Sequence, residues 1–138
     1  MTALPEAEVT LTVPFHDVDA MEIVWHGHYA KYFEIARCAL LDKVAYNYNE
    51  MKASGYAWPI IELKTRYIKP AVFGQDIKVR ARFKEYDLRL KIEYLITDAA
   101  SGARLTKGHS VQVAVDMAKG ELLLASPSIL LEKLGVTR

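Results

Sequence analysis

The stretch from Tyr29 to Val44, YAKYFEIARCALLDKV, decides the fold. Its apolar residues recur at steps of three and four, which is the spacing of one face of an α-helix. The residues at these steps are Tyr29, Phe33, Ala36, Leu40 and Val44. Further apolar residues (Tyr32, Ile35 and Leu41) lie between them. The pattern therefore predicts a helix that begins near Gly27 and is covered on most sides rather than along one stripe.

Strand-like segments flank this helix. Residues 9–13 alternate between apolar and polar and end at Pro14, and later strands are predicted at residues 58–68, 76–84, 90–96 and 111–115. Short turns containing Asp87, Ser101-Gly102 and Lys119-Gly120 favour antiparallel pairing between the later strands. Residues 46–49 and 54–55 are expected to close the helical region. A last short helix is predicted at residues 129–134, with Ser126 as its N-cap and Pro127 at its first position.

One long apolar helix and about five antiparallel strands make an α+β arrangement, in which the apolar face of the sheet wraps the helix. Such a sheet keeps two open edges, and a long edge strand favours pairing with another chain. We therefore expect a single domain over residues 1–138 that assembles into a homodimer or homotetramer.

The composition is that of a chain with a core of its own. Of 138 residues, 51% are hydrophobic and 25% charged, which excludes a disordered chain. The single cysteine, Cys38, excludes an internal disulfide and any multi-cysteine metal site. The longest apolar runs are far shorter than the roughly 20 residues that span a bilayer, and the N-terminus does not resemble a signal peptide. We expect a soluble, cytoplasmic protein with no cofactor and no membrane partner.

Charge is unevenly placed, although the net charge is only +1. Residues 1–60 hold 4 Lys or Arg against 8 Asp or Glu, whereas residues 61–138 hold 14 against 9. Half of the basic residues fall between Lys64 and Lys91. A local basic face on a near-neutral chain suits a phosphorylated small ligand or an acidic partner. It suits nucleic acid less well, because nucleic-acid-binding domains are usually basic throughout.

Residues 16–28, HDVDAMEIVWHGH, hold three of the four histidines together with Asp17 and Asp19. This segment leads into the long helix, whose first N–H groups are unpaired and carry partial positive charge. A carboxylate at such a place stabilises the helix by about 0.3–1 kcal/mol, so one interpretation is that Asp17 and Asp19 are structural. In the other, a free N–H polarises a carbonyl oxygen while a carboxylate acts as nucleophile or base, as in an acyl-transfer hydrolase. The chain has no Gly-x-Ser-x-Gly elbow and no Gly-rich phosphate loop.

Several motifs carry a resemblance to a known family. They are Phe15-His16-Asp17-Val18-Asp19, Val24-Trp25-His26-Gly27-His28-Tyr29 and Tyr32-Phe33-Glu34-Ile35-Ala36-Arg37, followed by residues 67–77, residues 113–116 and the Ser126-Pro127 helix start. Over nearly the whole chain these motifs resemble the 4-hydroxybenzoyl-CoA thioesterase family of hotdog-fold proteins. The resemblance implies a curved five-stranded antiparallel sheet wrapped around a long central helix. It also implies an acyl-CoA or acyl-carrier-protein thioesterase, which hydrolyses a thioester to a free acid and a thiol.

The resemblance implies roles for individual residues as well. Asp19 matches the family's carboxylate that acts as nucleophile or general base on the thioester carbonyl. The amide at or beside His26 matches the donor that polarises the thioester oxygen, and in one branch of the family a histidine at this place is also functional. Gly27 and Tyr29 are expected to contact the substrate, and Asp17 to be mainly structural. Met21-Glu22 and His28 depart from the family's usual residues and bear on the shape of the acyl pocket.

Basic residues near Asp87 are candidates for binding the nucleotide end of the substrate. Lys84, Arg89 and Lys91 flank this turn, where the family tends to place basic nucleotide contacts. Lys84 also shares one face of its strand with Lys78, Arg80 and Arg82. That face is either a solvated surface that deters edge aggregation or a seat for the phosphates of CoA or for an acidic carrier protein. No aromatic residue stands among its exposed positions to stack nucleic-acid bases.

Two other interpretations of the same residues stay open. His16, Asp19, His26 and His28 could be metal ligands, since imidazole and carboxylate suit zinc, iron or manganese, but their spacing fits no standard motif. The chain could also be a non-catalytic module that binds acyl thioesters, or a dehydratase-like relative. Asp19 together with His26 favours the hydrolase, because a binding module needs no carboxylate at the scissile carbonyl.

Overall fold

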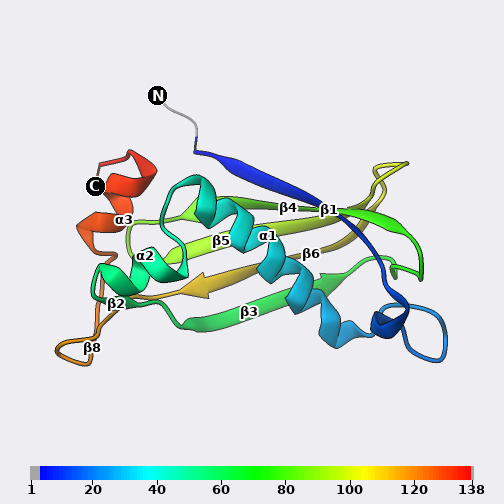
Figure 1. Ribbon diagram of the computed structural model, residues 1–138, viewed down its shortest axis with the longest axis horizontal. Coiled ribbons are helices and arrows are strands. Elements are labelled where there is room, and N and C mark those ends of the chain that lie inside the picture. The colour runs from blue at the N-terminus through cyan, green and yellow to red at the C-terminus, as the bar shows by residue number, and fades with distance from the viewer. Residues whose placement is uncertain (1–3, 138) are drawn as a thin grey trace.

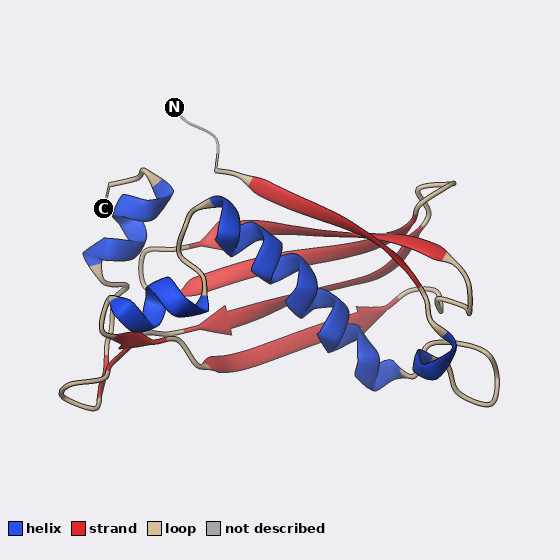
Figure 2. Ribbon diagram, in the orientation of Figure 1, coloured by secondary structure: helices blue, strands red, loops and turns tan. Residues whose placement is uncertain are grey.

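The computed structural model describes residues 4–137 and consists of a curved antiparallel sheet with a long helix across one face (Figures 1 and 2). The sheet has five strands in the order β1-β4-β5-β6-β3. Their bounds are Glu6–Thr12 (β1), Asp76–Glu85 (β4), Leu90–Asp98 (β5), Arg104–Gln112 (β6) and Ile60–Tyr67 (β3), and the helix α1 is Tyr29–Lys43. The predicted α+β hotdog arrangement is therefore confirmed. The N-terminal residues 1–3, on which the expectation about a signal peptide partly rests, lie outside the described residues.

The core lies between α1 and the concave face of the sheet. Every second side chain of β4 and β5 points into it, as the alternation in the sequence predicts. These buried residues are Ile77, Val79, Ala81 and Phe83 in β4, and Leu90, Ile92, Tyr94 and Ile96 in β5. From the helix, Phe33, Ala36 and Leu40 are fully buried against them. Burying each large apolar side chain contributes roughly 1.5–3 kcal/mol, so this interface is the main source of stability.

One glycine sets how closely the helix approaches the sheet. A Cβ at Gly108 of β6 would lie 2.2 Å from the Lys64 carbonyl oxygen and 2.8 Å from the ring of Phe33. Phe33 uses this room to stack on Tyr94, with ring centroids 4.6 Å apart and an interplanar angle of 10°. Only glycine fits here, because the nearest atom belongs to the main chain and cannot move aside.

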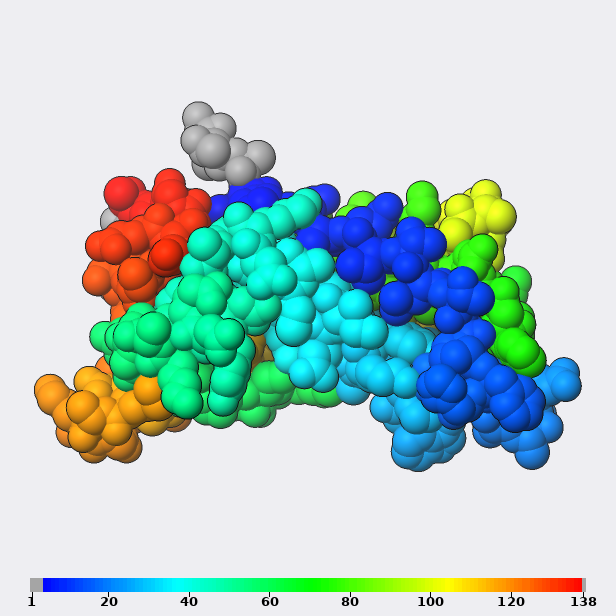
Figure 3. Space-filling view, viewed as in Figure 1, coloured from blue at the N-terminus to red at the C-terminus, as the bar shows by residue number. Residues whose placement is uncertain are grey.

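The helix is covered less completely than its sequence suggests. Its outward stripe stays exposed, and this stripe includes Ile35 as well as Lys31 and Glu34. Figure 3 shows the side chains of α1 and of the following segment across the middle of this face, with the green segment around β3 still visible beside them.

The structure differs from the predicted elements in four places. A further helix, Tyr48–Ala53 (α2), follows α1, and a capping box between Asn47 and Glu50 holds its start. A second small sheet joins Tyr56–Ala57 (β2), Val115–Asp116 (β7) and Glu121–Leu122 (β8), so the strand predicted at residues 111–115 is divided between β6 and β7. The strand β6 begins at Arg104 rather than at residue 111. The last helix is Ser128–Leu134 (α3), and its N-cap is Pro127, so the prediction of Ser126 as N-cap is wrong.

The two edges of the main sheet are unlike. At β3 nearly all side chains are exposed, among them Ile60, Ile61, Leu63 and Tyr67. At β1 the outward positions carry Glu6 and Glu8, and the Lys43 amino group donates a hydrogen bond to the Glu6 carbonyl. The β3 edge is thus unpaired in the isolated chain, and it carries exposed apolar side chains beside the charged residues Glu62, Lys64 and Arg66. No helix within residues 4–137 is both long and apolar enough to cross a membrane.

Candidate active site

The segment between β1 and α1 folds into a small hairpin. A 3-10 helix, Phe15–Asp17 (η1), leads into it, and Val18 then pairs with Val24 across an isolated bridge. At its tip Glu22 donates its main-chain N–H to the Asp19 carbonyl at 2.9 Å. Glu22 adopts a φ of 64°, a conformation that non-glycine residues rarely take. The hairpin lies at the end of the molecule away from α2 and α3 (Figure 1).

Asp17 is buried and fully engaged. Its side chain is 1% exposed, and its two oxygens accept hydrogen bonds from Lys31 Nζ at 2.6 Å and from the Tyr32 hydroxyl at 2.7 Å. Burial alone raises the pKa of the Asp17 carboxyl, but these hydrogen bonds and the charge of Lys31 outweigh it, so the pKa lies below its ordinary value. Burial and the hydrogen bond to Asp17 in turn raise the pKa of Tyr32. Asp17 thus ties the hairpin to the first turns of α1.

Asp19 is exposed, in contrast to Asp17. One of its carboxylate oxygens accepts the Met21 main-chain N–H at 2.8 Å. This local bond orients the side chain within the turn and leaves further lone pairs of the carboxylate accessible. Of the two aspartates, Asp19 is therefore the one that can meet a ligand.

The start of α1 offers unpaired main-chain donors. A short 3-10 helix, His26–His28 (η2), precedes α1, and His28 donates its N–H to the Trp25 carbonyl at 2.9 Å. For the N–H groups of His26 and Gly27 no acceptor is found among the described residues. No side chain caps this end of the helix. Such amides are suited to stabilise developing negative charge on an oxygen.

The indole of Trp25 lies over Gly27. A Cβ at Gly27 would come within 2.1 to 2.7 Å of three indole carbons, so this position requires glycine while the indole stays in place. The same indole contacts the rings of His26 and His28, with centroids 4.9 and 5.4 Å away. Trp25 is itself half-exposed, and together these side chains form an aromatic wall beside the unpaired amides.

Tyr67 at the end of β3 belongs to the same neighbourhood, although sequence reasoning did not single it out. Its hydroxyl donates a hydrogen bond to the His26 carbonyl at 2.9 Å, and its ring lies 5.2 Å from that of Tyr29. Burial raises the pKa of Tyr67. Tyr29 is only 2% exposed, and its hydroxyl accepts the Ala71 N–H at 3.2 Å. In this structure Tyr29 therefore packs inside the site rather than lining its surface.

The basic residues Lys84, Arg89 and Lys91 lie at the other end of the sheet. They surround the turn between β4 and β5, next to the start of α3, where Ser126 donates its N–H to the Asp87 carbonyl at 2.8 Å. Arg89 forms an ion pair with Glu85 at 2.9 Å. Within one chain, these three basic residues are therefore far from the hairpin, because the turn between β4 and β5 and the hairpin lie at opposite ends of the molecule (Figure 1).

The histidines do not assemble with the carboxylates into a metal site. His16 and His28 come to 3.7 and 4.0 Å from an oxygen of Asp17, which is already occupied by Lys31. Within the part of the chain that the structure describes, no group of three or more His, Cys, Asp or Glu side chains could hold a metal ion. The metal-binding interpretation therefore lacks a ligand set here.

Comparison with known proteins gives relatives for both sequence and fold. A Synechocystis protein provisionally named an esterase is 27% identical over 128 residues, which cover 92% of this chain and 77% of the relative. A Bacillus subtilis protein provisionally named an acyl-CoA thioesterase is 27% identical over 77 residues, or 56% of each chain. The solved structure of a 1,4-dihydroxy-2-naphthoyl-CoA thioesterase from Synechocystis superimposes with a TM-score of 0.83 at 16% identity, over 95% of this chain and 96% of the other.

The family assignment rests on the sequence itself. Residues 13–133 match the family model of the thioesterase-like superfamily, and this range contains the hairpin, α1 and all of the sheet except β1. The match agrees with the predicted enzyme class, a thioester hydrolase. The chain therefore belongs to the thioesterase-like superfamily.

Proposed function

We propose that this protein hydrolyses acyl-CoA thioesters, with Asp19 as nucleophile or general base and the amides of His26 and Gly27 as donors to the thioester oxygen. The observation that carries the proposal is the contrast at the start of α1. There, two main-chain N–H groups lack acceptors while an accessible carboxylate stands in the adjoining hairpin. Both carboxylate oxygens of Asp17 already accept hydrogen bonds from Lys31 and Tyr32, which leaves Asp19 as the proposed reactive carboxylate.

Two chemical courses fit this arrangement. In the first, an Asp19 oxygen attacks the carbonyl carbon and the C–S bond breaks. The thiolate takes up a proton, and water then cleaves the mixed anhydride. In the second, Asp19 takes a proton from water as the water oxygen attacks the carbon, and the proton passes to the departing sulfur. In both courses the carbonyl oxygen gains negative charge, which the unpaired amides stabilise by about 2.7–4 kcal/mol per donor. We propose that the exposed His26 imidazole assists the proton transfers.

We further propose that the active assembly is a homodimer or homotetramer joined at β3. This edge strand is eight residues long and unpaired, and it exposes Ile60, Ile61 and Leu63. When two copies pair antiparallel about a two-fold axis, one end of each sheet lies beside the opposite end of its partner. That arrangement brings Lys84, Arg89 and Lys91 of one copy towards the hairpin of the other. The open edge therefore supports a substrate whose thioester and nucleotide ends contact different copies.

The finer assignments are also proposals. We propose membership of the 4-hydroxybenzoyl-CoA thioesterase family, supported by the motifs around Asp19 and His26, and a single domain over residues 1–138. The name of the Bacillus relative supports CoA as the thiol carrier. An acyl-carrier-protein thioester is the other carrier to be tested, and a non-catalytic thioester-binding module is the competing function.

The test is a panel of aryl-, short- and long-chain acyl-CoA thioesters, assayed for thiol release with wild type and Asp19→Asn. The substitution keeps the shape of the side chain and removes its charge. We expect kcat to fall by about 1,000-fold or more while KM and the thermal midpoint change little. Glu22→Gln, which changes another exposed carboxylate of the same hairpin, is the matched control and should retain turnover. Near-normal turnover by Asp19→Asn would refute the assignment, and wild type that binds thioesters without cleaving them would identify a binding module.

A further inference from the structure

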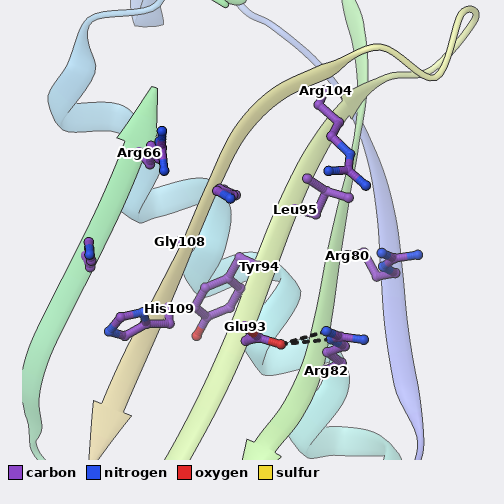
Figure 4. A pocket seen from close by; sticks show the side chains of 11 residues that line it. Arg66, Arg80, Arg82, Glu93, Tyr94, Leu95, Arg104, Gly108 and His109 are labelled. Carbon is purple, nitrogen blue, oxygen red and sulfur yellow. Dashed lines mark hydrogen bonds and ion pairs between the residues drawn. The ribbon is translucent and has the colours of Figure 1, made fainter. Parts of the chain in front are cut away.

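The face of the sheet opposite α1 holds a hollow of about 420 Å³ whose lining is mostly basic (Figure 4). We call it the outer-face hollow. Its basic lining residues are Lys64, Arg66, Arg80, Arg82, Arg104 and Lys107, together with His109. The register of the sheet arranges the side chains of this face in rows that run across the strands. The charges in two neighbouring rows differ.

One row is balanced. It runs from Lys64 on β3 through His109, Glu93 and Arg82 to Glu6 on β1. Arg82 forms an ion pair with Glu93 at 2.8 Å, which Figure 4 marks, and His109 contacts Glu62 at 2.7 Å. Charges of opposite sign therefore face one another, as is usual on a solvated sheet face.

The next row is not balanced. It runs from Arg66 through Lys107, Leu95 and Arg80 to Glu8. Arg66 stands directly opposite Lys107, a pairing of like charges that destabilises a sheet. Leu95 occupies the place that Glu93 has in the balanced row, so no acid separates the cations.

The cations around Leu95 are also unpaired. Among residues 4–137, no carboxylate lies within ion-pair distance of Arg66, Arg80, Arg104 or Lys107. Arg104, from the start of β6, approaches Leu95 from the neighbouring row (Figure 4). Several positive charges thus gather around one apolar side chain, and the carboxylate at the end of this row, Glu8, forms its ion pair with Lys78 instead.

We propose that the outer-face hollow binds a small ligand that carries two or more phosphate groups. Arginine matches phosphate geometry with paired hydrogen bonds, and several cations from three strands can contact more than one phosphate at once. The basic area is bounded by the balanced row on one side and by Glu8 on another, so it fits a small polyanion rather than a long strand of nucleic acid. Of the aromatic rings that line it, Tyr94 points inwards and the His109 imidazole is held by Glu62, so recognition rests on phosphate rather than on a base.

This site is separate from the proposed catalytic residues and from Lys84, Arg89 and Lys91, and it does not depend on the proposed function. It nevertheless shares a strand with the active site. Arg66 points to the hollow, while its neighbour Tyr67 donates to the His26 carbonyl on the other side of the sheet. The ligand is either a free nucleoside diphosphate or the nucleotide end of CoA, since both carry a pyrophosphate; in the second case the hollow takes the role proposed above for Lys84, Arg89 and Lys91.

The test measures binding of inorganic pyrophosphate, ADP and CoA by titration calorimetry at low salt. We expect all three to bind wild type and to raise its thermal midpoint. The double variant Arg80→Ala/Lys107→Ala should weaken binding by at least about tenfold. Lys78→Ala removes one charge from the same face but outside the hollow, and it should leave the dissociation constants unchanged.

Leu95→Glu is the sharper variant. It places an acid between Arg80 and Lys107, as in the balanced row, so it should abolish pyrophosphate binding and raise the thermal midpoint of the ligand-free protein. Leu95→Gln, of similar size but uncharged, should keep binding. If Leu95→Glu or the double variant binds pyrophosphate like wild type, or if wild type binds none of the three ligands, the proposal is wrong.

Steady-state kinetics distinguish the two sources of the ligand. ADP that competes with acyl-CoA, together with a raised KM in Arg80→Ala/Lys107→Ala, supports the nucleotide end of the substrate. ADP that binds without changing KM supports a separate free nucleotide. Calorimetry reports the site even if wild type cleaves no thioester, so failure of the proposed function and failure of this site are distinguishable.

Discussion

Replacing Asp17 by Asn should lower the temperature at which the protein unfolds, while leaving in place Asp19, the proposed reactive carboxylate. The amide has the shape of the carboxylate and can still accept a hydrogen bond from Lys31, while the Tyr32 hydroxyl can turn to accept from the new NH₂ group. The number of hydrogen bonds is then conserved, and the loss is the charge. The bond from the Lys31 ammonium loses the charge of its acceptor, and the bond with the Tyr32 hydroxyl becomes a neutral one.

The structure sets the magnitude. The Asp17 side chain is 1% exposed but that of Lys31 is 44% exposed, so water screens one partner of the pair. Breaking a fully buried pair costs about 3–5 kcal/mol and an exposed pair about 0–1 kcal/mol, and we expect a loss of about 2 kcal/mol in unfolding free energy. For a chain of this length, that lowers the thermal midpoint by about 6–10 °C.

The assay is thermal unfolding of wild type, Asp17→Asn and the control Asp19→Asn as a function of pH. Because the pKa of Asp17 is lowered in the folded state, its contribution is present above the unfolded-state pKa of about 3.9 and is lost as the pH falls through the folded value. The difference between wild type and Asp17→Asn should therefore be full at pH 7 and shrink below about pH 4. Equal midpoints for the two variants at pH 7, or a difference that persists unchanged in acid, would refute this account.

Three further outcomes are expected. Arg89→Ala/Lys91→Ala should raise KM for acyl-CoA with little change in kcat, because phosphate contacts persist from ground state to transition state. An unchanged KM in steady-state assays would show that both side chains are solvent-exposed residues without a contact to the substrate. Sedimentation at micromolar concentration should show a dimer or larger, and Leu63→Lys at the open edge should dissociate it; an active wild-type monomer would contradict the assembly. Gly108→Ala should lower the unfolding free energy by about 1–3 kcal/mol or more in denaturant titrations, since its Cβ meets a carbonyl and Phe33. A stability like that of wild type would show that α1 can move away.

The regular elements could be predicted wherever burial imposes a period on the chain. The alternation of β4, from Ile77 to Phe83, places each apolar residue on the helix and was enough to identify the strand. The part of β6 before residue 111 was not predicted as a strand, because its inward-facing residues are Thr106, Gly108 and Ser110. Small or polar residues stand there where Phe33 and Tyr94 already fill the space, so the strand shows no apolar alternation.

The site could be predicted only as far as it is local in sequence. Asp19, His26 and Gly27 lie in one segment, and the helical spacing of apolar residues that begins at Tyr29 predicts a helix directly after it. The role of Tyr67 depends on β3 ending beside η2, a contact between positions 41 residues apart. The outer-face hollow depends in the same way on register. Arg66 and Lys107 become neighbours only when β3 and β6 pair, and no pattern within either strand reveals it.

The contrast between the two sheet edges also determines how far assembly can go. Pairing of β3 with a second β3 is isologous: each copy uses its open β3 edge, so pairing through the sheet stops at a dimer, and a tetramer needs a second interface. Pairing of β3 with β1 would be heterologous and would leave a fresh apolar edge on every added copy, which is the geometry of a growing fibre. Glu6 and Glu8 on β1, together with the Lys43 amino group on the Glu6 carbonyl, oppose that second mode. In the proposed assembly, Glu6, Glu8 and Lys43 would thus limit the pairing of β3 to a finite oligomer.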